Sequence, residues 1–179
     1  MKDTAMHLSA PMQRFVLHWG EMGARWGVNR SIAQIHALLY LADTPMHAED
    51  ITDTLKIARS NVSNSLKELQ VLGLVQREHV MGDRRDHFTA SHEPWDMLMA
   101  IAEARKQREI DPTIALLKEC AAMAAEDPDT PQSAVERLQR MESFVSNLTD
   151  WYGQIRKLPQ GTLIKLMNLG TRIAKFVGG

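Results

Sequence analysis

The chain has 179 residues, of which 44% are apolar and 24% are charged, the composition of an ordinary globular protein that can bury a sizeable core. No run of about 18 apolar residues is present, which excludes a membrane-spanning helix of the usual length. The net charge of −1 gives no overall basic excess of the kind common in nucleic-acid-binding proteins, so charge has to be examined locally. With one cysteine, Cys120, and no apolar signal sequence, the chain is expected to be cytoplasmic.

Two helices are predicted near the N-terminus. Apolar residues recur every three or four positions over Phe15–Trp26, which indicates an amphipathic helix that ends at Gly27. Ser31 is expected to cap the next helix, Ile32–Ala42, and Pro45 breaks the chain after it.

A helix-turn-helix is predicted next. A short helix, Ala48–Leu55, is followed after three residues by a longer helix, Arg59–Leu72, and Gly73 is placed to end the pair. The buried stripe of the longer helix is expected to consist of Val62, Leu66, Leu69 and Leu72.

A hairpin and a helical C-terminal region follow. Two short strands, Leu74–Val80 and Asp86–Ser91, flank a turn in which Gly82 supplies the positive φ. The remaining chain is expected to form four helices, over Trp95–Arg108, Pro112–Ala125, Ser133–Gln154 and Thr162–Val177.

These elements predict a mainly α fold with a small β-hairpin wing. Residues 30–92 form a winged helix-turn-helix, 1–29 contribute an N-terminal helix that supports the core or a dimer, and 93–179 form a helical dimerisation and effector region. The sequence shows no internal repeat and no low-complexity segment.

Polar side chains that suit DNA occupy the exposed positions of the longer helix of the pair. They are Arg59, Ser60, Asn61, Ser63, Asn64 and Lys67. The candidates for base contacts are Arg59, Asn61, Ser63 and Asn64, because Arg, Asn and Ser can hydrogen-bond base edges in the major groove. Ser60 and Lys67 are expected to contact phosphates. A merely solvated surface is the alternative, but such a surface more often carries Glu, Lys and Gln.

Two arginines lie in the turn of the hairpin. Arg84 and Arg85 follow Gly82 and Asp83, and in a wing they would contact the minor groove or the phosphates beside the major groove. A solvated turn is the alternative.

Three segments carry a family resemblance. They are Ile51–Val75 (ITDTLKIARSNVSNSLKELQVLGLV), Gly82–Ala90 (GDRRDHFTA) and Glu93–Met97 (EPWDM). The stretch Asp50–Trp95 resembles the DNA-binding module of MarR-type regulators, and the last two segments resemble the GbsR branch. The resemblance implies a homodimeric transcription factor, usually a repressor, that binds a palindromic operator. Some regulators of this kind sense choline or related osmolyte precursors.

One position departs from the family pattern. Family members often have Ser or Thr where this chain has Ala58, whose side chain cannot cap a helix. Ser60 is therefore an alternative start for the recognition helix.

Apolar stripes near the C-terminus are candidates for a dimer interface. One stripe is Phe144, Leu148, Trp151 and Ile155, and a second includes Leu166, Leu169 and Ile173. A palindromic operator requires two DNA-binding modules, so these stripes are expected to serve both the core and a dimer. Packing within one subunit alone is the alternative.

A small-molecule effector, choline-like if the resemblance holds, would need an aromatic cage. The large aromatic residues available are Trp19, Trp26, Tyr40, Trp95, Trp151 and Tyr152. Each of them is more readily explained as a core residue, so no ligand is assigned from them.

No chemistry beyond binding is predicted. The seven histidines and Cys120 form no metal-ligand pattern, and no nucleophile motif or phosphate-binding glycine loop is present, so neither a metal, a cofactor nor an enzymatic activity is expected. The sequence predicts a sequence-specific regulator that binds double-stranded DNA. A winged helix that binds protein instead is the alternative, although such a module tends to expose acidic or apolar residues where this chain has Arg, Asn, Ser and Lys.

Overall fold

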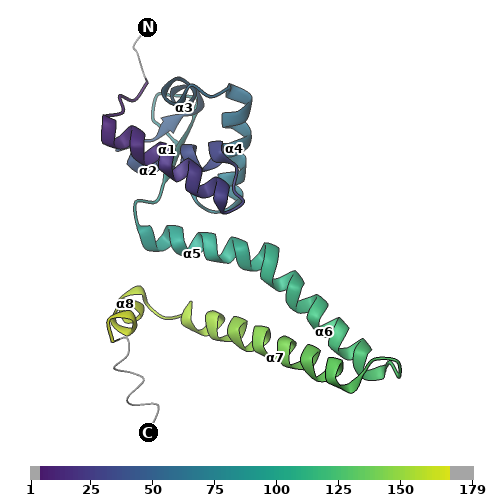
Figure 1. The fold of residues 1–179 in the computed structure, drawn as a ribbon. Coiled ribbons are helices and arrows are strands. Elements are labelled where there is room, and N and C mark those ends of the chain that lie inside the picture. Colours follow the sequence, from purple (N-terminus) through teal and green to yellow (C-terminus); the bar gives the residue numbers. More distant parts are fainter. Residues whose placement is uncertain (1–4, 170–179) are drawn as a thin grey trace. The chain divides into compact units, whose positions relative to one another are not determined.

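The computed structural model describes residues 5–169 (Figure 1). The chain divides into two compact units, Met1–Ile101 and Ala102–Gly179, and each is described by itself. The elements of the first unit, before the helix that leads out of it, are α1 (Ala10–Arg25), α2 (Arg30–Leu41), β1 (Met46–His47), α3 (Ala48–Leu55), α4 (Arg59–Val71), β2 (Val75–His79) and β3 (Asp86–Ala90). The predicted mainly α fold with a hairpin wing is confirmed.

Helices α1 and α2 pack closely against each other. Gly23 has no side chain, and a Cβ atom placed there would lie 2.6 Å from the Cβ of Ala33, so glycine permits this approach. The cap of α2 differs from the prediction: Asn29 is the N-cap, and its Oδ1 accepts from the Ser31 amide at 2.8 Å. Ser31 lies inside the first turn because Asn29 already supplies the acceptor that the helix end requires.

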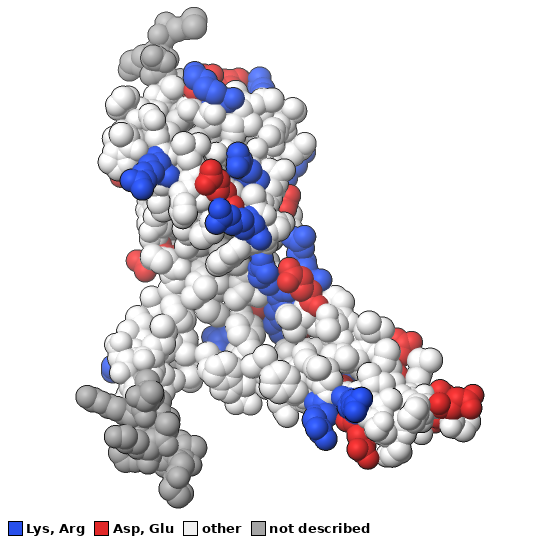
Figure 2. Space-filling view, in the orientation of Figure 1, with Lys and Arg blue, Asp and Glu red and all other residues white. Residues whose placement is uncertain are grey.

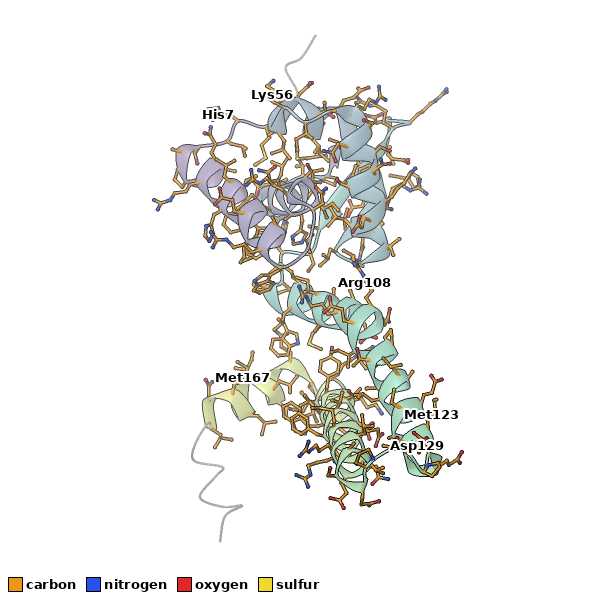
Figure 3. All side chains as sticks on the ribbon, turned by 45° about the vertical axis from the view of Figure 1, so that its right-hand side comes forward. His7, Lys56, Arg108, Met123, Asp129 and Met167 are labelled. Carbon is orange, nitrogen blue, oxygen red and sulfur yellow. The ribbon has the colours of Figure 1, made fainter. Side chains whose placement is uncertain are left out.

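The helix-turn-helix consists of α3 and α4. Lys56, labelled in Figure 3, ends α3 with φ of 55°, the left-handed conformation that reverses the chain within a three-residue turn. Helix α4 begins at Arg59, with Ala58 as an N-cap that makes no side-chain hydrogen bond. The alternative start at Ser60 is therefore wrong. Leu72, predicted as the end of the buried stripe, is the C-cap and only half-buried.

The wing is part of a three-stranded antiparallel sheet in the order β1-β3-β2. Strand β1 was not predicted, because two residues give no periodicity. It pairs with β3, the middle strand of the sheet, Met46 with Phe88 and His47 with His87. This pairing joins the residues just before α3 to the wing.

The core of the first unit lies between α2, α3 and α4. Ile35, Leu38, Ile51, Val62 and Leu69 have at most 1% of their surface exposed. Because α4 places Val62 and Leu69 in this core, its opposite face is directed to solvent.

The helices of the C-terminal region are more continuous than predicted. They are α5 (Pro94–Arg105), a π-helical turn (Lys106–Ile110), α6 (Asp111–Glu126), α7 (Gln132–Ile155) and α8 (Gln160–Leu169). A break before Pro112 was predicted, but the chain stays helical through the wider turn. Pro112 is accommodated there in the first turn of α6, where its missing N–H costs least.

Ile173, one of the predicted interface residues, lies outside the described residues. Within the described part of the chain, no helix has both the length and the apolar character needed to cross a bilayer.

Candidate nucleic-acid interface

Helix α4 exposes most of the polar side chains that were predicted to face DNA. Its first turn holds no acidic residue. Five of the six candidates are exposed, and they are Arg59, Ser60, Ser63, Asn64 and Lys67. The opposite face packs into the core, so these side chains form one surface along the helix.

Asn61 is the sixth candidate, and it has partners within the protein. Its Nδ2 donates to the Ser31 hydroxyl at 2.9 Å, and its Oδ1 accepts from the Ser65 hydroxyl at 3.4 Å. The side chain is half-buried, and Ser65 is buried. Asn61 thus joins the start of α4 to the start of α2, while its contact with bases stays a prediction.

Arg59 forms a surface ion pair with the helix before it. Its Nη1 lies 3.3 Å from Oε1 of Glu49 on α3, and the Arg59 side chain remains 74% exposed. An ion pair this open contributes little and exchanges readily, so the guanidinium stays available to a phosphate or a base.

The two wing arginines differ in their surroundings. Arg84 is exposed, and among the described residues no carboxylate pairs with it. Arg85, in contrast, donates from Nε to both Asp83 oxygens at 3.0 Å and from Nη2 to Asp83 Oδ2 at 2.5 Å. The Arg85 side chain, followed by its backbone N–H, holds the pKa of Asp83 well below its usual range.

His47 caps the first helix of the pair. Its Nδ1 accepts from the amides of Glu49 and Asp50, both at 3.1 Å, and its side chain is buried. This cap was not predicted, because histidine is not among the usual N-cap residues. The available signal was its place directly before a helix with two acidic residues in its first turn.

Charge over this unit is mixed. Figure 2 shows basic side chains with acidic ones between them, and no continuous basic patch covers the face in view. On this face, any affinity for DNA would therefore depend on individual cations, in agreement with the net charge of −1.

An apolar cavity of about 230 Å³ lies in the same unit, away from the exposed face of α4. Its lining residues are Phe15, Trp19, His36, Ala37, Tyr40, Pro94 and Met97. Burial lowers the pKa of His36 to about 4, so this histidine is neutral near pH 7. Of the aromatic residues considered from the sequence, the cavity brings together Trp19 and Tyr40, with Phe15 between them in ring contact with both.

The remaining aromatic candidates do not join this cavity. Trp26 is 57% exposed at the end of α1, and Trp151 and Tyr152 belong to the second unit. The described residues also contain no group of His, Cys, Asp and Glu side chains that could hold a metal ion.

The predicted apolar stripe on α7 is largely open. Phe144, Leu148 and Trp151 are 64%, 53% and 58% exposed, whereas Ile155 is half-buried. Met141, which the sequence analysis did not include, is 53% exposed and extends the stripe by one turn. On α8, Leu166 and Leu169 are 38% and 44% exposed.

Comparison with known proteins finds a family match in the central segment. Residues 26–86, about a third of the chain, match the model of the MarR family, and this segment contains α2, α3, α4 and most of the wing. No curated protein matches the chain at a significant level by sequence.

Several solved structures are similar to this chain, among them that of a transcriptional regulator. One of them is 20% identical, covers 80% of this chain and 99% of its own, and superposes with a TM-score of 0.54. A mutant of S. aureus MepR bound to an oligodeoxyribonucleotide is 15% identical, with coverage of 81% and 90% and a TM-score of 0.38. A regulator from Thermotoga maritima is also 15% identical, with coverage of 84% and 100% and a TM-score of 0.38. At 20% identity, the similarity to the first structure shows the fold alone. The other two structures, with TM-scores of 0.38, add nothing to this conclusion.

If the Asn61–Ser31 hydrogen bond positions α4, the two side chains should be energetically coupled. Asn61→Ala and Ser31→Ala should each lower the free energy of unfolding by about 1 kcal/mol, and the double variant should lose little more than the larger single loss. Urea denaturation measures all four proteins. Ser63→Ala, on the exposed face of α4, is the matched control and should stay within about 0.5 kcal/mol of the unsubstituted protein. Fully additive losses would contradict the coupling.

Proposed function

We propose that this chain, whose central segment matches the MarR family, is a sequence-specific DNA-binding regulator of transcription, and that it acts as a repressor. The observation that supports this most is the exposed face of α4, which presents Arg59, Ser63 and Asn64 with no acidic side chain in its first turn. A helix with such a face fits the major groove of DNA. Acidic residues there would be repelled by the phosphates. The chain is proposed to carry no catalytic function.

Within this proposal the side chains divide by role. Asn64, Ser63 and Arg59 read base edges, since amide, hydroxyl and guanidinium groups match the donors and acceptors in the major groove. Ser60 and Lys67 bind phosphates, and Arg84 contacts the minor groove or its backbone.

The proposal extends to a homodimer on a palindromic operator. An operator of that kind places equivalent half-sites about 34–36 Å apart, so one recognition helix cannot read both. The α7 stripe of Met141, Phe144, Leu148 and Trp151 supports a second copy of this chain as the partner, because a 3-4-3 spacing of exposed apolar side chains favours helix pairing.

The proposal also includes a ligand response. The cavity bounded by Phe15, Trp19 and Tyr40 offers aromatic faces and, among the residues lining it, no charged group at neutral pH. Aromatic faces attract quaternary ammonium groups, which agrees with the choline-like effector that the GbsR resemblance implies. That branch assignment rests on the Gly82–Ala90 and Glu93–Met97 motifs.

Binding to DNA is the first test. The protein should bind the DNA upstream of its own gene at least about 100-fold more tightly than random duplex, and should lose roughly 1000-fold in affinity between about 50 and about 200 mM salt. Asn64→Ala should reduce the preference for its operator by about 5-fold or more, and Arg84→Ala should weaken binding to every sequence. Fluorescence anisotropy measures both effects.

Matched controls lie on α7. Asn147→Ala and Arg137→Ala remove the same groups from exposed positions and should leave DNA binding unchanged. A chain that binds no DNA even at low salt would refute the regulator and favour the protein-binding module.

Dimerisation is tested separately by analytical ultracentrifugation. Leu148→Glu should shift the protein from dimer to monomer, because a buried, unpaired carboxylate is costly at an apolar interface. Gln139→Glu introduces the same charge on another exposed position of α7 and should leave the dimer intact. A monomer before substitution, or a dimer that survives Leu148→Glu, would contradict this interface.

Ligand binding is tested by isothermal titration with choline. Saturable heat should be seen with the unsubstituted protein and with Trp26→Leu, and it should disappear in Trp19→Leu, which removes one wall of the cavity. The absence of saturable binding up to about 10 mM, well above the range of ordinary effector sites, would exclude choline as the ligand.

A further inference from the structure

Two buried histidines face each other at the base of the wing. His47 on β1 and His87 on β3 are cross-strand partners, 4% and 7% exposed, with ring centroids 5.8 Å apart. They are two of the four buried polar or charged side chains found among the described residues. Beside them stands Arg85, one of the two wing arginines, together with carboxylates from α3 and the wing.

The hydrogen bonds fix the neutral form of His47. Because Nδ1 accepts from two backbone amides, the ring proton is on Nε2, which lies 3.3 Å from Asp50 Oδ2. Protonation of Nδ1 would remove the cap of α3. Arg85 Nη1, 2.6 Å from Nε2, therefore meets an N–H donor and gains no hydrogen bond there. Arg85 is held by Asp83 and, more loosely, by Glu49 at 3.9 Å.

His87 has the opposite arrangement. Its Nδ1 lies 3.1 Å from the carbonyl oxygen of Arg85, which can only accept, so the neutral ring carries its proton on Nδ1. Nε2 then presents a lone pair toward Asp83 Oδ2, 3.6 Å away. A second proton on Nε2 would convert this contact of two acceptors into a charged hydrogen bond. His87 is thus placed to gain a proton, and its partner would be the carboxylate that holds Arg85.

We propose that His87 is a proton-linked positioning residue for the wing: when it is protonated, Asp83 turns from Arg85 to His87, and the guanidinium of Arg85 is released to bind DNA phosphate. The proposal rests on the DNA-binding function put forward above. It implies that DNA binding takes up a proton and that affinity rises as the pH falls through the range in which histidines titrate.

Charged groups from several elements surround His87. Asp83 faces its Nε2, Glu49 and Asp50 of α3 lie beyond the His47 ring, and Glu78 of β2 is its other cross-strand partner. Asp50 Oδ1 is buried and has no hydrogen-bond donor among the described residues. Arg85 is the cation among these groups. An imidazolium at His87 would repel its guanidinium, which favours the release of Arg85.

Asp83 can serve in both arrangements because it stays ionised. Its pKa lies below the ordinary range while Arg85 is bound, and an imidazolium in place of the guanidinium would again favour the anion. The exchange therefore involves one proton, taken up by His87 from solvent, and no change at Asp83.

The test is the affinity for an operator duplex, or for random duplex at low salt, between about pH 8 and about pH 6 at constant ionic strength, a range in which the bases do not titrate. The unsubstituted chain should bind about 5-fold to 10-fold more tightly at the lower pH. His87→Asn, which keeps a donor for the Arg85 carbonyl but cannot be protonated, should bind equally at both values. His79→Asn, an exposed histidine at the end of β2, is the control and should keep the full dependence.

A second measurement reads the ring directly and does not depend on the variant folding. Nitrogen-15 NMR of labelled histidines in the full chain should show His87 protonated on Nδ1 alone at about pH 8 and on both nitrogens when DNA is bound at about pH 6. Affinity that is flat with pH, a dependence that survives in a folded His87→Asn, or a ring that stays neutral on DNA would each overturn the proposal. Loss of DNA binding at every pH would instead refute the proposed function.

Discussion

The packing of α2 against α4 determines what this protein can present to a partner. Ile35 and Leu38 of α2 and Val62 and Leu69 of α4 are almost fully excluded from water, and burial of such side chains is worth about 1.5–3 kcal/mol each. A helix fixed on one side by this core has no freedom to rotate about its axis. The Asn61–Ser31 hydrogen bond adds a polar contact between the same two helices. The exposed row from Arg59 to Lys67 is therefore a consequence of the core, and not an independent feature.

The sequence predicted the features that depend on periodicity. Helices such as Ala48–Leu55 were predicted with the bounds that the structure shows, and the hairpin was placed within one or two residues, because the apolar pattern and Gly82 are local signals. The same local reasoning placed Asn61 among the exposed residues. Its partner Ser31 is 30 positions away in the sequence, whereas helical periodicity relates only residues a few positions apart. The prediction treated Asn61 as a surface residue because it could not include the helix packed beside it.

The polar network at the wing was missed for a related reason. His47 and His87 carry no motif in the sequence, since 39 intervening residues separate two side chains that meet only when β1 pairs with β3. Strand β1 has two residues, too few for an alternating pattern. Arg85 was predicted as a DNA contact from its type and its turn, which is sound chemistry for an arginine without a partner. The structure adds Asp83, whose oxygens already accept from that guanidinium.

This internal pairing has a consequence for how such a chain can bind DNA at a net charge of −1. Arg59 and Arg85, two of the cations nearest the proposed DNA surface, are both paired with Glu49 or Asp83, so the field of the free protein is weaker than its arginine count suggests. To bind a phosphate, each of these arginines must then exchange its carboxylate for the phosphate. This exchange lowers the net free energy gained from the contact. In the proposed function, a weak intrinsic attraction to DNA would keep nonspecific binding low and leave discrimination to the base contacts of α4. It would also make the affinity for DNA respond to any change of the internal partner, such as a proton at His87 or a shift of α3 that moves Glu49. In the proposed function, the carboxylates around the wing would thus be part of the DNA-binding surface, because they set how much positive charge that surface can display.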